Sequence, residues 1–539
     1  MSASTKKKLH SAERAEKLTQ KQLEEQKEAK KLKVVTGIFV AAVALMLCFA
    51  IVITAVKTVE NSGIREKNTV ALTLNEHEIS NAELNYYYID AVNAFLNQYG
   101  SYAALLGLDT TKPLNEQVID ETTGLTWADD FLNSATENAK SVYALNDAAK
   151  AANFTMSEED QTNLEANLST VELYAIYSYG YPDMETYLKA MYGHGATEES
   201  YREYCTMNYL ADAYQSSYAS TLTYEDADLR EAEAENYDAY NSYSYNYYYI
   251  NASSLIEGTE YTDEEYAAAV KQAEEYANGL IADVDTVEAF DAAIAALPMN
   301  AENATAASNA TVDTLYGSVN TILRDWVADS SRKAGDVTVI ANTSTTTDEA
   351  GKETVKVNGY YAVIFGARNE NNYPMSNVRH ILAAFEGGTL DENGYKIYSD
   401  TEKNEAKLAA EVLLDKWKSG EATEESFADL ANKESDDGDG TTGGLYEDIN
   451  PTSNYVTNFL NWALEDHKPG DTGIVETEYG YHVMYFSGYS DMTYRDFMIT
   501  SDLQNADLSA WYTELVNAVE SKVLDTTYIN TGLVLSSGQ

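Results

Sequence analysis

The strongest constraint on the fold of this chain is an internal repeat that covers residues 246–365 and 377–486. The first copy opens with NYYYINASS and closes with VNGYYAVIF. The second opens with NVRHILAAF and closes with ETEYGYHVMYF. In both copies a capping-box helix start, Thr262-x-x-Glu or Ser399-x-x-Glu, precedes a phenylalanine by 28 residues. Matches in this fixed order predict that the chain folds one α/β unit twice.

Only the second copy keeps a pair of histidines. Aligning the copies on their outer segments places Tyr249 where His380 stands and Tyr361 where His482 stands. The chain has only six histidines, so a pair at the two ends of one repeat is informative. We expect the second copy to be catalytically active and the first to keep the same fold for another purpose.

A series of short motifs gives the second copy a family resemblance. In order, they are VRHIL, F-x-x-L-A-x-x-x-S-D-D, GGL, PGD and YGYHV. Together they make residues 372–489 resemble a parvulin-type peptidyl-prolyl isomerase domain. In that family two histidines lie back to back in the sheet under the catalytic groove, and a Cys or Asp faces the peptide. The resemblance assigns these catalytic positions to His380, His482 and Asp437, with Asp436 as the register alternative.

The resemblance also implies a hydroxyl at the site and an apolar pocket for the proline ring. Tyr479 occupies the hydroxyl-bearing position, and Leu445 and Phe459 are the pocket candidates. Tyr446 follows the Gly-Gly-Leu motif where the family commonly has glycine. Rotation about an X-Pro bond has a barrier of about 18–20 kcal/mol and requires no nucleophile or metal. We therefore expect no cofactor.

Metal-binding patterns give no contrary signal. The sequence contains no C-x-x-C or H-E-x-x-H motif, which argues against structural or catalytic zinc. The acidic stretch DDGDGTTGG lacks the ligand spacing of an EF-hand, so a solvated turn is the expected structure there.

An uncharged run of 23 residues, 34–56, predicts a membrane helix, because a helix of that length spans about 34 Å. Residues 1–33 hold 10 Lys/Arg against 5 Asp/Glu, so the positive-inside rule places the N-terminus in the cytoplasm and the bulk of the chain outside. A cleaved signal peptide is the alternative. A lipoprotein is disfavoured, because Leu-Met-Leu precedes Cys48 where small residues are needed.

The charge of the chain excludes one class of partner. With a formal net charge of −51, the protein lacks the basic surface that nucleic-acid binding requires. The acidity favours a soluble, self-repelling surface. The alternatives are steering of basic, unfolded clients and retention of cations near a polyanionic wall. Only Cys205 lies outside the predicted span, so no intrachain disulfide is expected.

The region before the repeats is predicted to be mostly amphipathic helix, because apolar and aromatic residues recur there at steps of three and four. Its pieces NEHEISNAEL, YLKAMYG with ATEESYREY, and TYEDADLR are similar to the helical chaperone domain of PrsA-type and SurA foldases. In that family a C-terminal helix packs on the N-terminal domain, which makes the repeats an insertion. Residues 490–539 contain one such helix.

The expected fold is α+β: a helical PrsA/SurA-like chaperone domain and two parvulin-like α/β domains, the first degenerate, preceded by one transmembrane helix. The expected function is that of an extracytoplasmic isomerase and chaperone for unfolded or newly exported polypeptides with X-Pro bonds. The alternative is an inactive holdase or scaffold. The oligomeric state stays open. The predicted segments are 1–33 cytoplasmic, 34–56 transmembrane, 57–240 chaperone-like, 241–371 degenerate repeat, 372–489 isomerase and 490–539 C-terminal helix.

Overall fold

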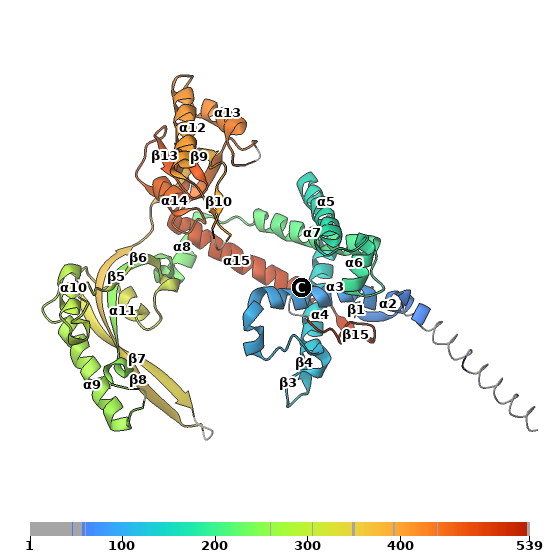
Figure 1. Ribbon diagram of the computed structural model, residues 1–539, viewed down its shortest axis with the longest axis horizontal. Coiled ribbons are helices and arrows are strands. Elements are labelled where there is room, and N and C mark those ends of the chain that lie inside the picture. Colours follow the sequence, from blue (N-terminus) through green and yellow to red (C-terminus); the bar gives the residue numbers. More distant parts are fainter. Residues whose placement is uncertain are drawn as a thin grey trace, which may run out of the picture. The chain divides into compact units, whose positions relative to one another are not determined.

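The computed structural model describes residues 46, 57–59 and 61–535, except 259, 304, 348–350, 392–393 and 439 (Figure 1). The expected membrane span, 34–56, lies outside the described residues apart from Met46. None of the helices in the described ranges is long and apolar enough to cross a bilayer. The chain divides into two compact units, of which one combines residues up to Leu222 with those from Asp507 onward, and the other is Thr223–Ala506.

The first unit is mainly helical, with a three-stranded sheet and a two-stranded one, β3 Val118–Asp120 with β4 Leu125–Thr126. The strands of the three-stranded sheet follow the order β15-β1-β2, so the C-terminal strand pairs with the first strand of the unit. The starts of α3 to α7 carry side-chain caps; at the start of α3, for example, the Ser80 hydroxyl accepts from the Glu83 N–H. The principal elements are α2 Ile64–Asn68, β1 Val70–Leu74, β2 His77–Ser80, α3 Asn81–Tyr99, α4 Trp127–Ala151, α5 Glu158–Leu173, α6 Met184–Tyr192, α7 Glu198–Thr221 and β15 Ser521–Val523.

Tyrosines form much of the core of this unit. The run Tyr86, Tyr87 and Tyr88 on α3 is buried, and Tyr86 stacks on Tyr204 of α7 with ring centroids 5.1 Å apart. The Tyr204 hydroxyl donates to Asp90 at 2.5 Å. These rings supply apolar area while some of their hydroxyls satisfy buried polar groups, which explains why the sequence uses tyrosine where phenylalanine is more usual.

The C-terminal segment is held by two buried asparagines of α3. The Asn81 side chain donates to the carbonyl of Asp525 and accepts from the N–H of Tyr528. The Asn85 side chain donates to the carbonyl of Tyr528 and accepts from the N–H of Asn530. The two ends of the described chain therefore belong to one folded unit.

The second unit contains two four-stranded antiparallel sheets with the same strand order. The order is β6-β5-β8-β7 in the first sheet and β12-β9-β14-β13 in the second. The elements of the first repeat are β5 Ser242–Asn251, α9 Asp263–Leu280, α10 Val287–Ala295, β6 Asn309–Leu315, α11 Arg324–Ala328, β7 Val337–Thr347 and β8 Glu353–Asn369. Those of the second are β9 Pro374–Ala384, α12 Asp400–Lys418, α13 Glu424–Glu434, β12 Leu445–Ile449, α14 Thr457–Leu464, β13 Thr472–Glu476 and β14 Gly480–Thr493.

The two repeats can be aligned on one glycine in each long strand. Gly359 pairs with Asn251, and Gly480 pairs with Ala384. A Cβ atom at either glycine would lie 2.2 Å from a carbonyl oxygen of the facing strand, so this close approach requires glycine in both copies. The glycine pairs fix the register of the comparison.

This register corrects one sequence alignment. Counting from the glycine pairs places Tyr361 at the position of His482, as expected, but places Tyr247 rather than Tyr249 at the position of His380. The two tyrosines are two residues apart and therefore lie on the same face of β5. A shift of two residues preserves the alternating pattern, which is why the sequence did not reveal it.

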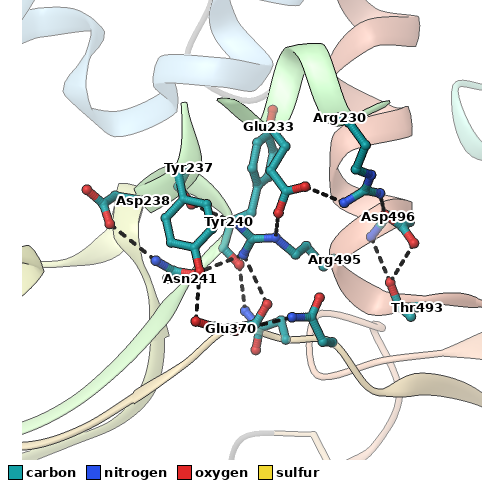
Figure 2. A network of polar contacts seen from close by, with 12 residues as sticks. Arg230, Glu233, Tyr237, Asp238, Tyr240, Asn241, Glu370, Thr493, Arg495 and Asp496 are labelled. Atoms are coloured by element: carbon teal, nitrogen blue, oxygen red, sulfur yellow. Dashed lines mark hydrogen bonds and ion pairs between the residues drawn. The ribbon is translucent and has the colours of Figure 1, made fainter. Parts of the chain in front are cut away.

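One buried arginine joins the segments on either side of the first repeat (Figure 2). Arg495 is 0% exposed and lies near the start of α15 (Tyr494–Asn517). Its Nε donates to Glu233 of α8 (Asp226–Glu235) at 2.5 Å, and Nη1 donates to Asn241 Oδ1 at 2.9 Å and to the Glu370 carbonyl at 3.0 Å. Nη2 donates to the Tyr237 carbonyl at 3.0 Å, so all three guanidinium nitrogens have partners.

Candidate active site

The central strands of the second sheet bring the two histidines together. His380 on β9 pairs with Met484, and His482 on β14 pairs with Leu382. The histidines are therefore diagonal neighbours on one face of the sheet, a position from which long side chains can meet. Their Nδ1 atoms lie 3.0 Å apart, and the residues are only 3% and 5% exposed.

The polar neighbours of the pair favour one tautomer of each ring. His380 Nε2 lies 3.3 Å from Asp437 Oδ2, and His482 Nε2 lies 3.0 Å from Thr477 Oγ1. An ionised carboxylate beside Nε2 favours the His380 tautomer that carries its proton on Nε2 and accepts at Nδ1. With this tautomer, His482 donates from Nδ1, and its Nε2 accepts from the Thr477 hydroxyl, which also lies 3.4 Å from the Gly480 carbonyl oxygen. This assignment gives a directed chain from Thr477 through both rings to Asp437.

Both rings are neutral at physiological pH. Burial lowers the pKa of His380 to about 4, and the neighbouring His482 ring adds to this effect, whereas the Asp437 charge opposes it. Burial likewise lowers the pKa of His482 to about 4, against the opposing charges of Asp437 and Glu478. The buried part of the chain is therefore an uncharged, oriented network that ends in a carboxylate.

The geometry distinguishes the two adjacent aspartates. The Asp436 carboxylate accepts from the Ala384 N–H at 2.9 Å, and the Asp436 N–H donates to the Leu382 carbonyl at 3.0 Å, so this residue closes the end of β9. Asp437 instead faces the histidines and accepts from the Tyr446 hydroxyl at 3.3 Å. Asp437 is thus the aspartate that belongs to the site.

A cavity of about 180 Å³ lies over this chain of residues. It is smaller than the roughly 300–1,000 Å³ of pockets for drug-sized ligands, and it suits one small side chain or ring. Phe459 packs edge-on against both histidines, with ring centroids 5.3 and 5.5 Å away. The lining residues are His380, Asp437, Tyr446, Asn454, Tyr455, Val456, Phe459, Tyr479 and His482.

Leu445, predicted to line the proline pocket, is not among these lining residues, whereas the next residue, Tyr446, is. Tyr446 stacks on His380 with ring centroids 4.9 Å apart and an angle of 28° between the rings. Successive residues of a strand point to opposite faces, so Leu445 and Tyr446 of β12 cannot both face the cavity. The sequence did indicate that Tyr446 is unusual, because it follows Gly-Gly-Leu where the family commonly has glycine. Nothing in the sequence indicated Tyr455, which lies in a loop that matches no motif.

Comparisons with known proteins concern the domain that contains this site. Residues 380–488 match the Rotamase family, described as the PPIC-type PPIase domain. This part of the chain is a PPIC-type peptidyl-prolyl isomerase domain. A comparison with curated proteins finds no match.

Three solved structures of PrsA from Bacillus species are similar to parts of the chain. The protein from B. anthracis, described as a peptidylprolyl isomerase, shares 21% identity over 28% of this chain and 59% of its own, with a TM-score of 0.17. The B. cereus protein, also described as a peptidylprolyl isomerase, shares 22% identity over 30% and 57%, with a TM-score of 0.17. The B. subtilis protein shares 13% identity over 78% and 98%, with a TM-score of 0.25. The chain therefore spans less than two thirds of the first two proteins.

Tyr479 lies at the rim of the isomerase cavity. Its side chain is 60% exposed, and its backbone N–H donates to Thr477 Oγ1 at 3.2 Å. The same threonine hydroxyl contacts His482, so the rim and the buried histidines share one anchoring residue. Tyr479 can meet a bound peptide without belonging to the buried chain.

A second, wider cavity of about 700 Å³ adjoins the isomerase cavity. The two share four lining residues, Asn454, Tyr455, Val456 and Tyr479, and so form one continuous depression. Lys403, Thr457, Asn458, Glu476, Thr477 and Glu478 complete the wall of the wider part. An extended polypeptide whose proline ring occupied the small cavity would pass through this polar groove.

The first repeat lacks the corresponding polar chain. Tyr247 and Tyr361 stand at the two histidine positions, with ring centroids 5.8 Å apart in an edge-to-face contact. Tyr249 packs against Tyr361 at 4.5 Å, and its hydroxyl accepts from Asn342 at 3.2 Å. Aromatic packing thus replaces the pair of neutral imidazoles.

Proposed function

We propose that this chain is an extracytoplasmic foldase whose PPIC-type domain isomerises X-Pro bonds in unfolded or newly exported polypeptides. The observation that carries the proposal is the directed Thr477–His482–His380–Asp437 chain beneath a small aromatic cavity. The family match of residues 380–488 supports the reaction type. The proposal assigns catalysis to the second repeat and polypeptide binding to the rest of the chain.

The cavity favours the twisted amide over the planar one. Resonance makes the planar peptide unit strongly polar, with a dipole of about 3.5 D, and this charge separation falls when the C–N bond rotates. Packing the proline ring against Tyr446 and Phe459 moves the bond out of water, so the less polar twisted form gains relative to the planar form. A thousandfold acceleration needs only about 4 kcal/mol of this difference.

The polar chain contributes orientation and charge. The neutral histidines hold the Asp437 carboxylate at the cavity wall without adding a positive charge of their own. A carboxylate near the substrate carbonyl opposes the negative charge that resonance places on its oxygen, which again favours the twisted amide. In this mechanism Asp437 acts directly on the substrate, and the histidines position it.

The decisive experiment compares matched positions in the two repeats. The His380→Ala/His482→Ala variant is expected to lose most of the isomerisation of a proline tetrapeptide, whereas Tyr247→Ala/Tyr361→Ala retains it. Circular dichroism must show that each variant is folded, because removing one buried polar partner leaves others unsatisfied. Equal losses in the two variants, or a loss only in the first repeat, would refute the assignment.

Exposed apolar side chains support an additional holdase function for the helical unit. Tyr102 and Leu105, in the 3-10 segment Gly100–Leu106, are 67% and 81% exposed, and Tyr177, after α5, is 80% exposed. Side chains of this kind can bind the apolar segments of unfolded clients. The folded histidine double variant is expected to keep suppressing client aggregation. A parallel loss of both activities would contradict separate functions and would favour one shared site.

The proposed topology has the N-terminus in the cytoplasm and residues from 57 onward outside. It rests on the uncharged sequence 34–56 and the basic residues before it. Protease added to intact cells is expected to degrade the body and leave an N-terminal stub. Full protection of the body would reject this topology, and a mature chain that starts after residue 56 would identify a cleaved signal.

A further inference from the structure

The groove beside the isomerase cavity carries carboxylates that its cations do not neutralise. Lys403 pairs with Glu476 at 3.3 Å, and Lys407, one turn further along α12, also acts on Glu476. Glu478 is exposed in the turn before β14, and it has no ion-pair partner within 4 Å among the described residues. The cationic side chains at the groove therefore interact with Glu476, and the carboxylate of Glu478 is not neutralised by an ion pair.

The isomerase cavity itself is also acidic. Asp437 is the one residue of its lining that is charged at neutral pH, because His380 and His482 are neutral there. The Glu478 charge reaches the same wall, since it acts on His482 and opposes the lowering of the His482 pKa by burial. Asp437 and Glu478 thus act on the cavity from different segments, and no cationic side chain lines it.

We propose that the isomerase domain selects prolyl bonds flanked by a lysine or arginine, and that Glu478 is a specificity-determining residue for this choice. The inference rests on the proposed isomerase function and adds the substrate class. An extended peptide with its proline ring beneath Tyr446 places its neighbouring side chains in the groove between Asp437 and Glu478. A basic side chain there is attracted by both carboxylates, and an acidic one is repelled by both.

The test measures kcat/KM of the purified full chain in a protease-free isomerisation assay. The substrates are Ala-Lys-Pro-Phe, Ala-Glu-Pro-Phe and neutral Ala-Leu-Pro-Phe, together with the set in which the charged residue follows proline. The lysine peptides are expected to exceed the glutamate peptides by about fivefold at low ionic strength. In 1 M salt, where the Debye length is about 3 Å, the ratio should fall to below about twofold.

Two matched charge reversals locate the effect. Glu478→Lys is expected to remove or invert the lysine preference, with the neutral peptide as the internal reference for folding and turnover. Glu421→Lys makes the same charge change just beyond the far end of α12. Because a helix of 19 residues is about 28 Å long, this site is far from the groove, and the ratio should stay unchanged.

The outcomes separate the inference from the function on which it rests. No acceleration of any of the peptides would overturn the isomerase function itself. Acceleration with equal rates for lysine and glutamate peptides, or with a preference for glutamate, would overturn the proposed substrate class. A lysine preference that Glu478→Lys and Glu421→Lys reduce equally would show that overall charge, and not Glu478, sets the specificity.

Discussion

The Nδ1 atoms of His380 and His482 face each other at 3.0 Å, a distance that allows one proton between them and not two. The contact between the rings holds only while His380 is neutral, because a proton on its Nδ1 would direct an N–H at the Nδ1–H of His482. A second proton on His482 would instead face the Thr477 hydroxyl, which would have to turn from donor to acceptor. The pair is therefore a structural element whose integrity depends on pH.

The domain is expected to lose stability on mild acidification. The pKa of each histidine is lowered to about 4 in the folded state, whereas unfolded histidine titrates near 6.5. Between these values the unfolded chain binds more protons, so stability is complete above pH 6.5 and falls as the pH drops toward 4. Urea unfolding at pH 7, 6 and 5 measures this slope, and a His380→Gln/His482→Gln variant should show less of it. A variant with the full slope would assign the acid sensitivity to other groups.

The Thr477 hydroxyl, which contacts the buried His482 ring, is expected to stabilise the isomerase domain. Thr477→Val removes the hydroxyl that donates to His482 Nε2 and leaves a buried acceptor without a partner, at a cost of about 1–3 kcal/mol. Thr477→Ser keeps the hydroxyl and is the matched control. The free energy of unfolding and the ¹⁵N shifts of the histidine rings report stability and tautomer. Equal behaviour of the two variants would mean that the threonine hydroxyl does not anchor the pair.

The two adjacent residues of β12 should differ in their effect on catalysis. Tyr446→Ala removes the ring that stacks on His380 and lines the cavity, so kcat/KM is expected to fall by about tenfold, the equivalent of roughly 1.4 kcal/mol of lost aromatic contact. Leu445→Ala should change kcat/KM by much less, since Leu445 does not line the cavity. A larger loss from Leu445→Ala than from Tyr446→Ala would contradict the strand orientation.

Arg495 is expected to be critical for the folding of the second unit. Arg495→Met removes the buried guanidinium, so that three backbone or amide oxygens lose their donor and Glu233 keeps only its ion pair with Arg230, a change that costs about 3–5 kcal/mol. Arg495→Lys keeps the charge but cannot donate in three directions, so it should recover only part of the loss. Thermal unfolding measures both. Full recovery by lysine would show that charge alone matters at this position.

The parts of the site that sequence could predict are those fixed by short motifs. His380, Asp437, His482 and Phe459 each lie in or beside a recognisable pattern, and the structure brings all four to one cavity. Tyr247 was missed because a two-residue register shift keeps the same strand face. Tyr455, the cavity residue in the loop before α14, lies outside any recognisable motif.

Arg495 gave no signal for a different reason. Its side-chain partners lie 254 and 262 residues away in the sequence, and the nearer backbone partner, Glu370, lies 125 away. Local periodicity carries no information about contacts at such separations, and an arginine near a helix start is unremarkable in sequence. The tertiary fold alone identifies it as buried and fully hydrogen-bonded.

The contacts of Arg495 also determine how much conformational entropy the chain loses by containing two repeats in place of one. Ion pairs from Arg230 to Asp496 and from Glu233 to Arg495 tie α8 to α15. Glu233 and Arg495 are 262 positions apart, so the chain between them forms a loop closed at its base. The entropy lost on closing a loop rises only with the logarithm of its length, by about 0.6 kcal/mol for each doubling. Duplicating a single repeat inside this closed loop would therefore add little to the closure cost. A second domain of the same fold, free to lose its histidines, can be accommodated without altering the segments that hold it.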